Sequence, residues 1–392
     1  MAPLNYTFSF PEYFHTSNLL LAGILLIYGV SCTTDDVIDR PLPEDLAPYF
    51  TPPAEFTVDY GVYRSPLLFK SGEKVRDKND WEIRRREILE KWHQKMGNWP
   101  DVIENPEVNY IASEQRKDFT QHKLEIEVAP GWMRDAYLLV PDLEGPLPAA
   151  LVVFYDAETS AGLRRKHRDF GYQLTKRGFV TLSFGSDPAE NYYPDSESAT
   201  LQPLSMLAYM AANSYHILAN LPEVDSERIG ITGFSYGSKW AMFASSFYDK
   251  FALGVWNDGG IVFDETRKDI NYWEPWYLGY EEGLGDDRYR GFERGLRIDY
   301  PSDDHPRTGP YKQMIDEEWN LHELHALMAP RPILVSGGSE DPPERWKALN
   351  HTVKVNRLLG YENRVAMHNR EEHAPNQESN DVIYQFFEHF LK

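Results

Sequence analysis

Residues 228–244 have the sequence RIGITGFSYGSKWAMFA, an apolar run followed by a glycine-rich turn and a helix-like segment. The turn, residues 233–237, matches the pattern G-x-S-x-G. A sharp strand-to-helix turn strains its central residue, and the flanking glycines relieve the crowding. Because the turn lies between a predicted strand and a predicted helix, we expect Ser235 to stand above a sheet as a nucleophile. The alternative is a glycine-rich turn with a purely structural role.

Short apolar runs on both sides of this turn predict the other strands of a sheet. Residues 149–155, AALVVFY, are continuously apolar, as is typical of a strand that is buried on both faces. Similar runs occur at 179–184, 251–256, 332–336 and 364–368, and helix-length segments lie around 163–177, 203–220, 238–249, 344–359 and 377–391. The alternation predicts an α/β fold, a doubly wound and mostly parallel sheet with helices on both faces. The gaps 185–202 and 257–330 are predicted loop insertions.

Ahead of these strands the sequence predicts a helix and a hairpin. Asp77 or Asn79 can cap a helix that runs to Met96, and residues 84–86 (RRR) are expected on its solvated face. Two alternating segments, 123–128 and 132–140, flank Pro130-Gly131 and predict a hairpin. We therefore expect residues 61–392 to form a single domain that includes this extension.

A serine nucleophile requires a general base, and in proteins with this type of turn the base is a histidine that comes after the serine in the sequence. Two histidines follow the last predicted strand closely enough to serve. His373 lies in the loop before the C-terminal helix, whereas His368 lies at the strand end and is expected to be a satisfied strand residue. The loop position favours His373.

Two carboxylates satisfy the order required of the residue that orients the histidine. Asp341 follows the predicted strand 332–336, and Asp258 follows the strand 251–256. Either could instead cap a glycine-containing turn. The two are nearly even, with a slight preference for Asp341.

Other residues near the turn are candidates for binding. The amide of Tyr236 is expected to donate to an oxyanion. Lys239 lies four residues after Ser235, on the same helix face, and could reach a substrate, or it could be an ordinary solvated or salt-bridged lysine. Trp273 and Trp276 lie in an aromatic insertion that offers flat faces to sugar rings or forms a packed flap.

Composition excludes several classes of function. With 40 basic and 61 acidic residues the net charge is −21, which disfavours nucleic-acid binding and docking of a basic face on anionic lipid. The single cysteine, Cys32, excludes an intramolecular disulfide and a cysteine-built zinc site. No HExxH motif, phosphate loop or dinucleotide fingerprint is present, so neither a metal nor a cofactor is expected.

The N-terminus predicts export. The apolar run at 19–31 is too short to span a bilayer as a helix but matches a signal-peptide core, although the first 18 residues contain no Lys or Arg. Small residues and then Cys32 resemble a bacterial lipoprotein signal. We expect residues 1–32 to be the signal, Cys32 to carry lipid and 33–60 to be a tether, which anchors the chain in the periplasm or at the cell surface. The alternative is a short buried helix.

Together these motifs resemble the α/β-hydrolase carbohydrate esterases, close to glucuronoyl esterases and acetyl xylan esterase-like hydrolases. The resemblance covers about 66–391, and its parts are 66–69 (PLLF), Gly72, 74–75 (KV), Trp81, 84–88 (RRREI), 233–237, 322–324 (HEL), 329–332 (APRP) and the His373 loop. It implies that Lys239 contacts sugar hydroxyls, and that Asp258 occupies an acid position where the family usually has Glu. Tyr236 stands where glucuronoyl esterases carry Arg.

The sequence therefore predicts a serine esterase that removes acetyl, methyl or glucuronoyl ester groups from a polysaccharide, without a cofactor. A serine peptidase of the same fold and a non-catalytic glycan-binding surface lipoprotein are the alternatives. No oligomeric state follows from these motifs.

Overall fold

Strand β4, Leu147–Phe154, explains why a continuous apolar run forms the centre of this fold. Seven of its eight residues are buried. Ala149, Leu151 and Val153 belong to one hydrophobic core, whereas Ala150, Val152 and Phe154 belong to a second core. Because successive side chains of a strand point to opposite faces, both faces of the sheet must be covered.

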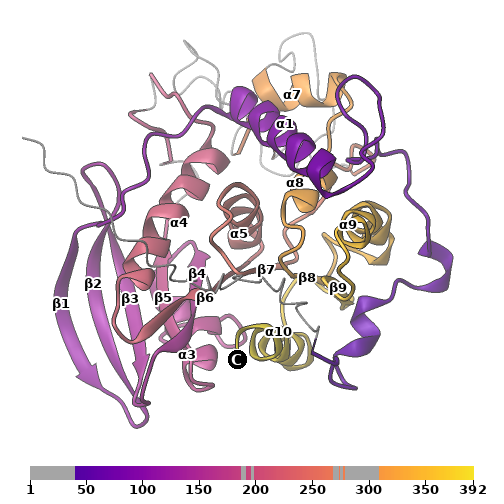
Figure 1. Ribbon diagram of the computed structural model, residues 1–392. Helices are drawn as coiled ribbons and strands as arrows, with labels where there is room; N and C mark the ends of the chain where they lie inside the picture. Colours follow the sequence, from indigo (N-terminus) through magenta and orange to yellow (C-terminus); the bar gives the residue numbers. More distant parts are fainter. Residues whose placement is uncertain (1–39, 187–190, 196–197, 268–272, 274–276, 279–308) are drawn as a thin grey trace, which may run out of the picture. The chain divides into compact units, whose positions relative to one another are not determined.

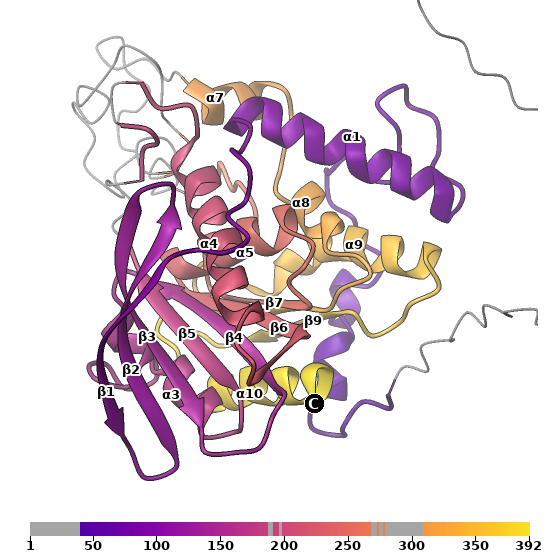
Figure 2. The same ribbon diagram turned by 60° about the vertical axis from the view of Figure 1, so that its left-hand side comes forward.

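The computed structural model describes residues 40–186, 191–195, 198–267, 273, 277–278 and 309–392, which fall in one compact unit. Within them the strand order is β1-β2-β3-β5-β4-β6-β7-β8-β9. The strands are β1 Val108–Gln115, β2 Phe119–Ala129, β3 Trp132–Pro141, β4, β5 Val180–Gly185, β6 Val224–Phe234, β7 Leu253–Asn257, β8 Ile333–Gly337 and β9 Val365–Asn369. Strands β4 to β9 are parallel to one another, and β1 to β3 add an antiparallel end (Figure 2).

Helices cover both faces of the sheet, as predicted. The helices are α1 Lys78–Met96, α2 Ala157–Ser160, α3 Phe170–Thr175, α4 Pro203–Ala219, α5 Tyr236–Phe247, α7 Gly309–Asp316, α8 His322–Leu327, α9 Trp346–Leu358 and α10 Gln377–Leu391. Figure 1 shows α4, α5, α8 and α9 on one face and α3 and α10 on the other, with α1 lying across the first group. The expectation of a doubly wound, mostly parallel α/β sheet is confirmed. None of the described helices is long and apolar enough to cross a bilayer.

Three local differences from the sequence expectations have physical reasons. Strand β1 was not predicted, because seven of its eight residues are exposed and it carries no apolar alternation. The helix expected over 163–177 is only α3, because residues 163–168 (LRRKHR) form a polar loop. In the expected tether, residues 40–60 carry two short 3₁₀ helices, and Leu46 is completely buried in the core beside α10. The proposed signal 1–32 lies outside the described residues.

Candidate active site

The turn between β6 and α5 has the geometry that its sequence predicts. Ser235 has φ 56° and ψ −113°, a left-handed conformation that is strained for a residue with a side chain. A Cβ on Gly233 would lie 2.3 Å from the carbonyl oxygen of Gly237. A Cβ on Gly237 would lie 2.0 Å from the carbonyl oxygen of Val153. Only glycine fits at either position, so the turn can approach β4 closely and hold Ser235 at the end of the sheet.

Loops after three strands bring a serine, a histidine and a carboxylate together. His373 Nε2 lies 2.9 Å from Ser235 Oγ, and His373 Nδ1 lies 2.6 Å from Asp258 Oδ2. An ionised carboxylate only accepts hydrogen bonds, so Nδ1 carries the proton and donates it. Nε2 of the neutral ring is then the acceptor for the Ser235 hydroxyl. This arrangement can activate the serine as a nucleophile.

Asp258 is held by backbone amides of a neighbouring loop. Its Oδ1 accepts from the N–H groups of Gly338 at 2.6 Å, Glu340 at 3.1 Å and Asp341 at 2.9 Å. The side chain is fully buried. Three donors on Oδ1 fix the orientation of the carboxylate, so that Oδ2 faces His373, with Nη2 of Arg370 3.9 Å away from the same oxygen.

The geometry does not match the slight preference for Asp341 as the partner of His373. Oδ1 of Asp341 accepts from the N–H of Ile261 at 2.6 Å, and Oδ2 of Asp341 accepts from the N–H of Gly260 at 2.9 Å. Burial, and then the charge of Asp258, raise the pKa of Asp341. Each of the two loops therefore binds the carboxylate of the other, and Asp341 braces the segment that carries Asp258.

Tyr236 places its backbone and its side chain in different environments. Its N–H is the first of α5, and the first N–H groups of a helix point out of its end, where a negative charge would be stabilised. Its ring stacks between Tyr155 and Tyr277, with centroids at 4.7 and 5.9 Å, and its hydroxyl accepts from Asn191 Nδ2 at 3.2 Å. An aromatic stack thus occupies the place where the resemblance implies an arginine.

Lys239 and Trp273 are both buried close to the triad, rather than solvated. Nζ of Lys239 donates to the carbonyl oxygen of Gly259, and it lies 4.9 Å from the centre of the Trp273 ring. Burial lowers the pKa of Lys239 to about 8. The interpretation of Lys239 as a solvated lysine is therefore wrong. Complete burial of Trp273 is what a packed flap would give, and Trp276 lies outside the described residues.

Two further residues complete the neighbourhood of His373. His368 lies on β9, as expected, and packs edge-on against Tyr49 with ring centroids 5.2 Å apart, but its buried Nδ1 has no hydrogen-bond partner among the described residues, so it is not the satisfied residue that was expected. Sequence reasoning missed Arg370. Its Nη2 donates to the carbonyl oxygen of His373 at 2.6 Å, and its Nη1 donates to that of Ser336 at 3.0 Å. Arg370 thus fastens the His373 loop to β8, a role that no local sequence pattern signals.

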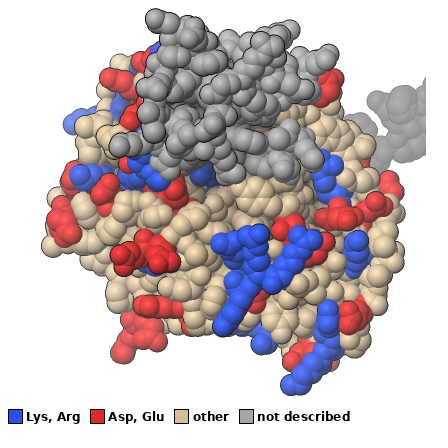
Figure 3. Space-filling view, turned by 180° about the vertical axis from the view of Figure 1, so that it is seen from behind, with Lys and Arg blue, Asp and Glu red and all other residues tan. Residues whose placement is uncertain are grey.

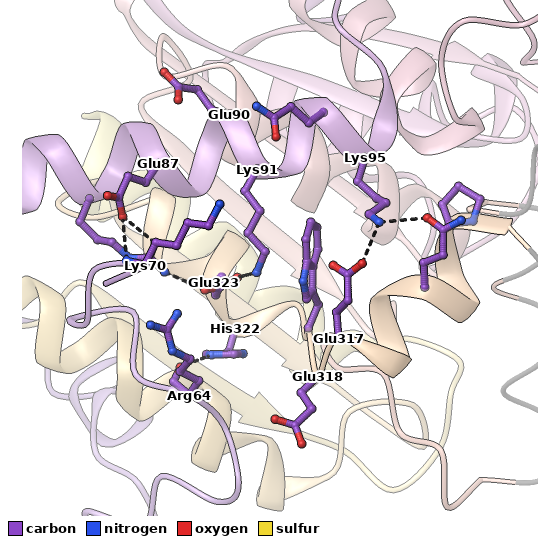
Figure 4. A pocket seen from close by; sticks show the side chains of 15 residues that line it. Arg64, Lys70, Glu87, Glu90, Lys91, Lys95, Glu317, Glu318, His322 and Glu323 are labelled. Carbon is purple, nitrogen blue, oxygen red and sulfur yellow. Dashed lines mark hydrogen bonds and ion pairs between the residues drawn. The ribbon is translucent and has the colours of Figure 1, made fainter. Parts of the chain in front are cut away.

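A separate cavity of about 720 Å³ lies between α1, α7 and α8 (Figure 4). None of the triad residues lines it. Arg84 is buried there and donates to Glu323 at 2.9 Å and to Glu87 at 3.0 Å, and Lys91 also donates to Glu323, at 2.6 Å. The expectation that this arginine lies on a solvated face is wrong, because α8 presents a buried carboxylate to α1. The contact joins two segments that carry the family resemblance.

Comparison with models of known protein families gives no match, and comparison with curated proteins also gives none. Solved structures give matches at low sequence identity. A glucuronoyl esterase from Solibacter usitatus is 17% identical, with a TM-score of 0.64, over 86% of this chain and 100% of that one. A promiscuous CE15 esterase from a marine bacterial metagenome is 17% identical, with a TM-score of 0.62, and the match covers 84% of this chain and 97% of that one. A candidate acetyl xylan esterase from Bacteroides fragilis is 16% identical, with a TM-score of 0.53, over 81% and 80%.

These likenesses show that the chain has the α/β-hydrolase fold of these proteins. The expected resemblance to glucuronoyl esterases and acetyl xylan esterase-like hydrolases is confirmed at the level of the fold.

Proposed function

We propose that this protein is a serine hydrolase that cleaves carboxylic esters of a polysaccharide. The observation that carries the proposal is the pair of contacts from His373, at 2.9 Å to Ser235 and 2.6 Å to Asp258, on a strained strand-to-helix turn. The folds of the carbohydrate esterases support the same reaction class.

In the proposed mechanism Ser235 Oγ attacks the ester carbonyl carbon while His373 Nε2 takes its proton. Asp258 keeps the other ring proton on Nδ1 and stabilises the imidazolium. The oxyanion accepts a hydrogen bond from the N–H of Tyr236. The imidazolium then protonates the leaving alcohol, and water hydrolyses the acyl-enzyme by the same steps in reverse. His373 is 40% exposed, so water and an alcohol group can reach it.

The ester that is cut can be an acetyl, methyl or glucuronoyl ester. Tyr236 in place of an arginine argues against the oxyanion arrangement of glucuronoyl esterases, and leaves hydrolysis of the other two intact. We also propose that Cys32 is lipidated and anchors the exported enzyme to a membrane, which would bring it to polysaccharide outside the cytoplasm.

Labelling and turnover test the proposal together. Purified protein is treated with a fluorophosphonate probe and screened on acetylated, methyl-esterified and glucuronoyl-ester glycans, with a peptide-amide panel beside them. We expect labelling at Ser235, and turnover of at least one glycan ester that is lost in Ser235→Ala. Ser71→Ala, which changes an exposed turn serine, is the matched control and should retain activity. Binding of glycans without labelling or turnover would refute the enzyme, and cleavage of amides alone would make it a peptidase.

A further inference from the structure

A basic loop lies at the same end of the sheet as the triad. Residues 164–168, RRKHR, lie in the connection between α2 and α3, which follows the carboxyl end of β4. Four of these five residues are Lys or Arg, in a chain of net charge −21. On the side of the molecule drawn in Figure 3, a group of Lys and Arg side chains gathers near the centre, whereas acidic side chains are more widely scattered. Although the net charge is negative, the surface of this protein therefore carries local groups of positive charge.

One guanidinium of the loop reaches the wall of the triad. The Arg168 Cζ lies 4.8 Å from the centre of the Phe234 ring. The His373 ring lies 4.8 Å from the same centre, tilted by 38°. Phe234 directly precedes Ser235, so the guanidinium and the catalytic imidazole contact one ring beside the nucleophile. A guanidinium that packs over an aromatic ring keeps its N–H donors available in its own plane.

Two cations of the loop have no acidic partner within the part of the chain that the structure describes. Arg164, at the start of the loop, lies 3.6 Å from Asp156 and 3.7 Å from Glu158. Arg165 and Arg168, in contrast, make no side-chain hydrogen bond or ion pair with any described residue. Partial burial, and then the charge of Arg165, lower the pKa of Arg168. The N–H of Arg168 donates to the carbonyl oxygen of Arg165 at 3.3 Å, so the two residues share one turn of the loop. Two guanidinium groups on one turn, without acidic partners, favour the binding of an anion.

The loop is anchored rather than free. Asn380 Nδ2, from α10, donates to the carbonyl oxygen of His167 at 2.9 Å, and His167 adopts φ 64°. The N–H of Leu163 donates to the carbonyl oxygen of Glu158 at 2.9 Å. Since both ends of the basic segment are tied to the domain, a ligand that binds here orders little additional chain.

We propose that Arg168 and Arg165 form a subsite for a free carboxylate of the glycan, so that the substrate is an acidic polysaccharide with a uronate next to the esterified sugar. A carboxylate matches the planar fork of a guanidinium. The position of the ester at Ser235 rests on the proposed function, whereas binding of the carboxylate does not. Local cations let an anionic chain approach a protein that repels it elsewhere.

Binding is tested with glycans that contain no ester, so that turnover is not required. Tetragalacturonate and the neutral xylotetraose are titrated into wild-type protein, Arg168→Gln, Arg165→Gln and Arg357→Gln by calorimetry at 20 and 200 mM salt. Arg357, which is 58% exposed and paired with Glu362 on another part of the surface, is the matched control. We expect Arg168→Gln to weaken tetragalacturonate binding by roughly tenfold, since one charge-assisted interaction is lost. Added salt should weaken binding to the wild type, and Arg357→Gln should bind as the wild type does.

Kinetics then test the link to catalysis. The ratio of kcat/KM for an acetylated oligouronate to that for an acetylated xylo-oligosaccharide should fall about tenfold in Arg168→Gln and remain unchanged in Arg357→Gln. Loss of uronate binding in Arg168→Gln without any ester turnover by the wild type would sustain the subsite and refute the proposed function. Turnover with equal uronate affinity in both proteins would refute the subsite alone. Preference for a sulfated tetrasaccharide over tetragalacturonate would also overturn the carboxylate assignment.

Discussion

Replacement of Asp258 by Asn changes one oxygen to an NH₂ group, and the surrounding loop decides which oxygen. Three backbone N–H groups donate to Oδ1, at 2.6, 2.9 and 3.1 Å. Only the amide oxygen of Asn can accept those bonds. The NH₂ group must therefore take the place of Oδ2, 2.6 Å from Nδ1 of His373.

This forced orientation disables the base. The NH₂ group donates to Nδ1, so the neutral imidazole carries its proton on Nε2, where the Ser235 proton has to go. We expect kcat of Asp258→Asn to fall by about 10⁴-fold, the loss that a wrong histidine tautomer causes in the triad proteases. The free energy of unfolding should change by less than about 2 kcal/mol, because the three backbone hydrogen bonds persist.

Asp341→Asn is the matched comparison, because it makes the same chemical change one loop away. Both oxygens of Asp341 accept from backbone N–H groups, and Asn can accept with only one. One buried N–H therefore loses its partner, which lowers the free energy of unfolding by about 1–3 kcal/mol. The partner of His373 is intact, so kcat should fall by no more than about 100-fold, the effect of a small displacement of the Asp258 loop.

The measurements are initial rates on 4-nitrophenyl acetate at pH 7.5 and urea unfolding followed by tryptophan fluorescence. The reasoning is refuted if Asp341→Asn loses as much kcat as Asp258→Asn with its unfolding unchanged. Retention of activity within tenfold by Asp258→Asn would equally remove Asp258 from the mechanism.

Other variants test other contacts. Gly237→Ala should prevent correct folding or abolish activity, because its Cβ would lie 2.0 Å from a carbonyl oxygen of β4; circular dichroism and rates check this. Burial lowers the pKa of Lys239 to about 8, so above pH 8 the unfolded chain holds a proton on this residue that the folded chain has lost. The free energy of unfolding of the wild type, measured in urea relative to that of Lys239→Met, should therefore rise between pH 8 and 10. Arg84→Met should lower the free energy of unfolding by about 3–5 kcal/mol, because the buried Glu323 loses a charge partner, and Glu323→Gln in the same background should recover part of it. Cys32 should resist alkylation in protein from native membranes, since lipid would occupy its sulfur; a free thiol on an uncut chain contradicts the anchor.

Features that depend on neighbouring residues could be predicted from the sequence. The strand-to-helix turn at Ser235 follows from the steric needs of Gly233 and Gly237, and the burial of β4 follows from a run of apolar residues. The helix that ends at Met96 was predicted in the same way, with Asp77 as one of its two candidate caps. The position of His373 between the last strand and α10 follows from chain order.

Only the tertiary structure shows that Asp258, and not Asp341, contacts His373, because in the sequence each is a carboxylate in a glycine-containing loop after a parallel strand. What distinguishes them is which backbone N–H groups reach each carboxylate, and the donors lie about 80 positions away along the chain. The burial of Arg84 depended likewise on Glu323, 239 residues distant. Steric rules and apolar patterns act within short stretches of sequence, so their results can be predicted from the sequence. The partner of a buried charge lies far away along the chain, so it is known only from the folded structure, in which distant loops meet.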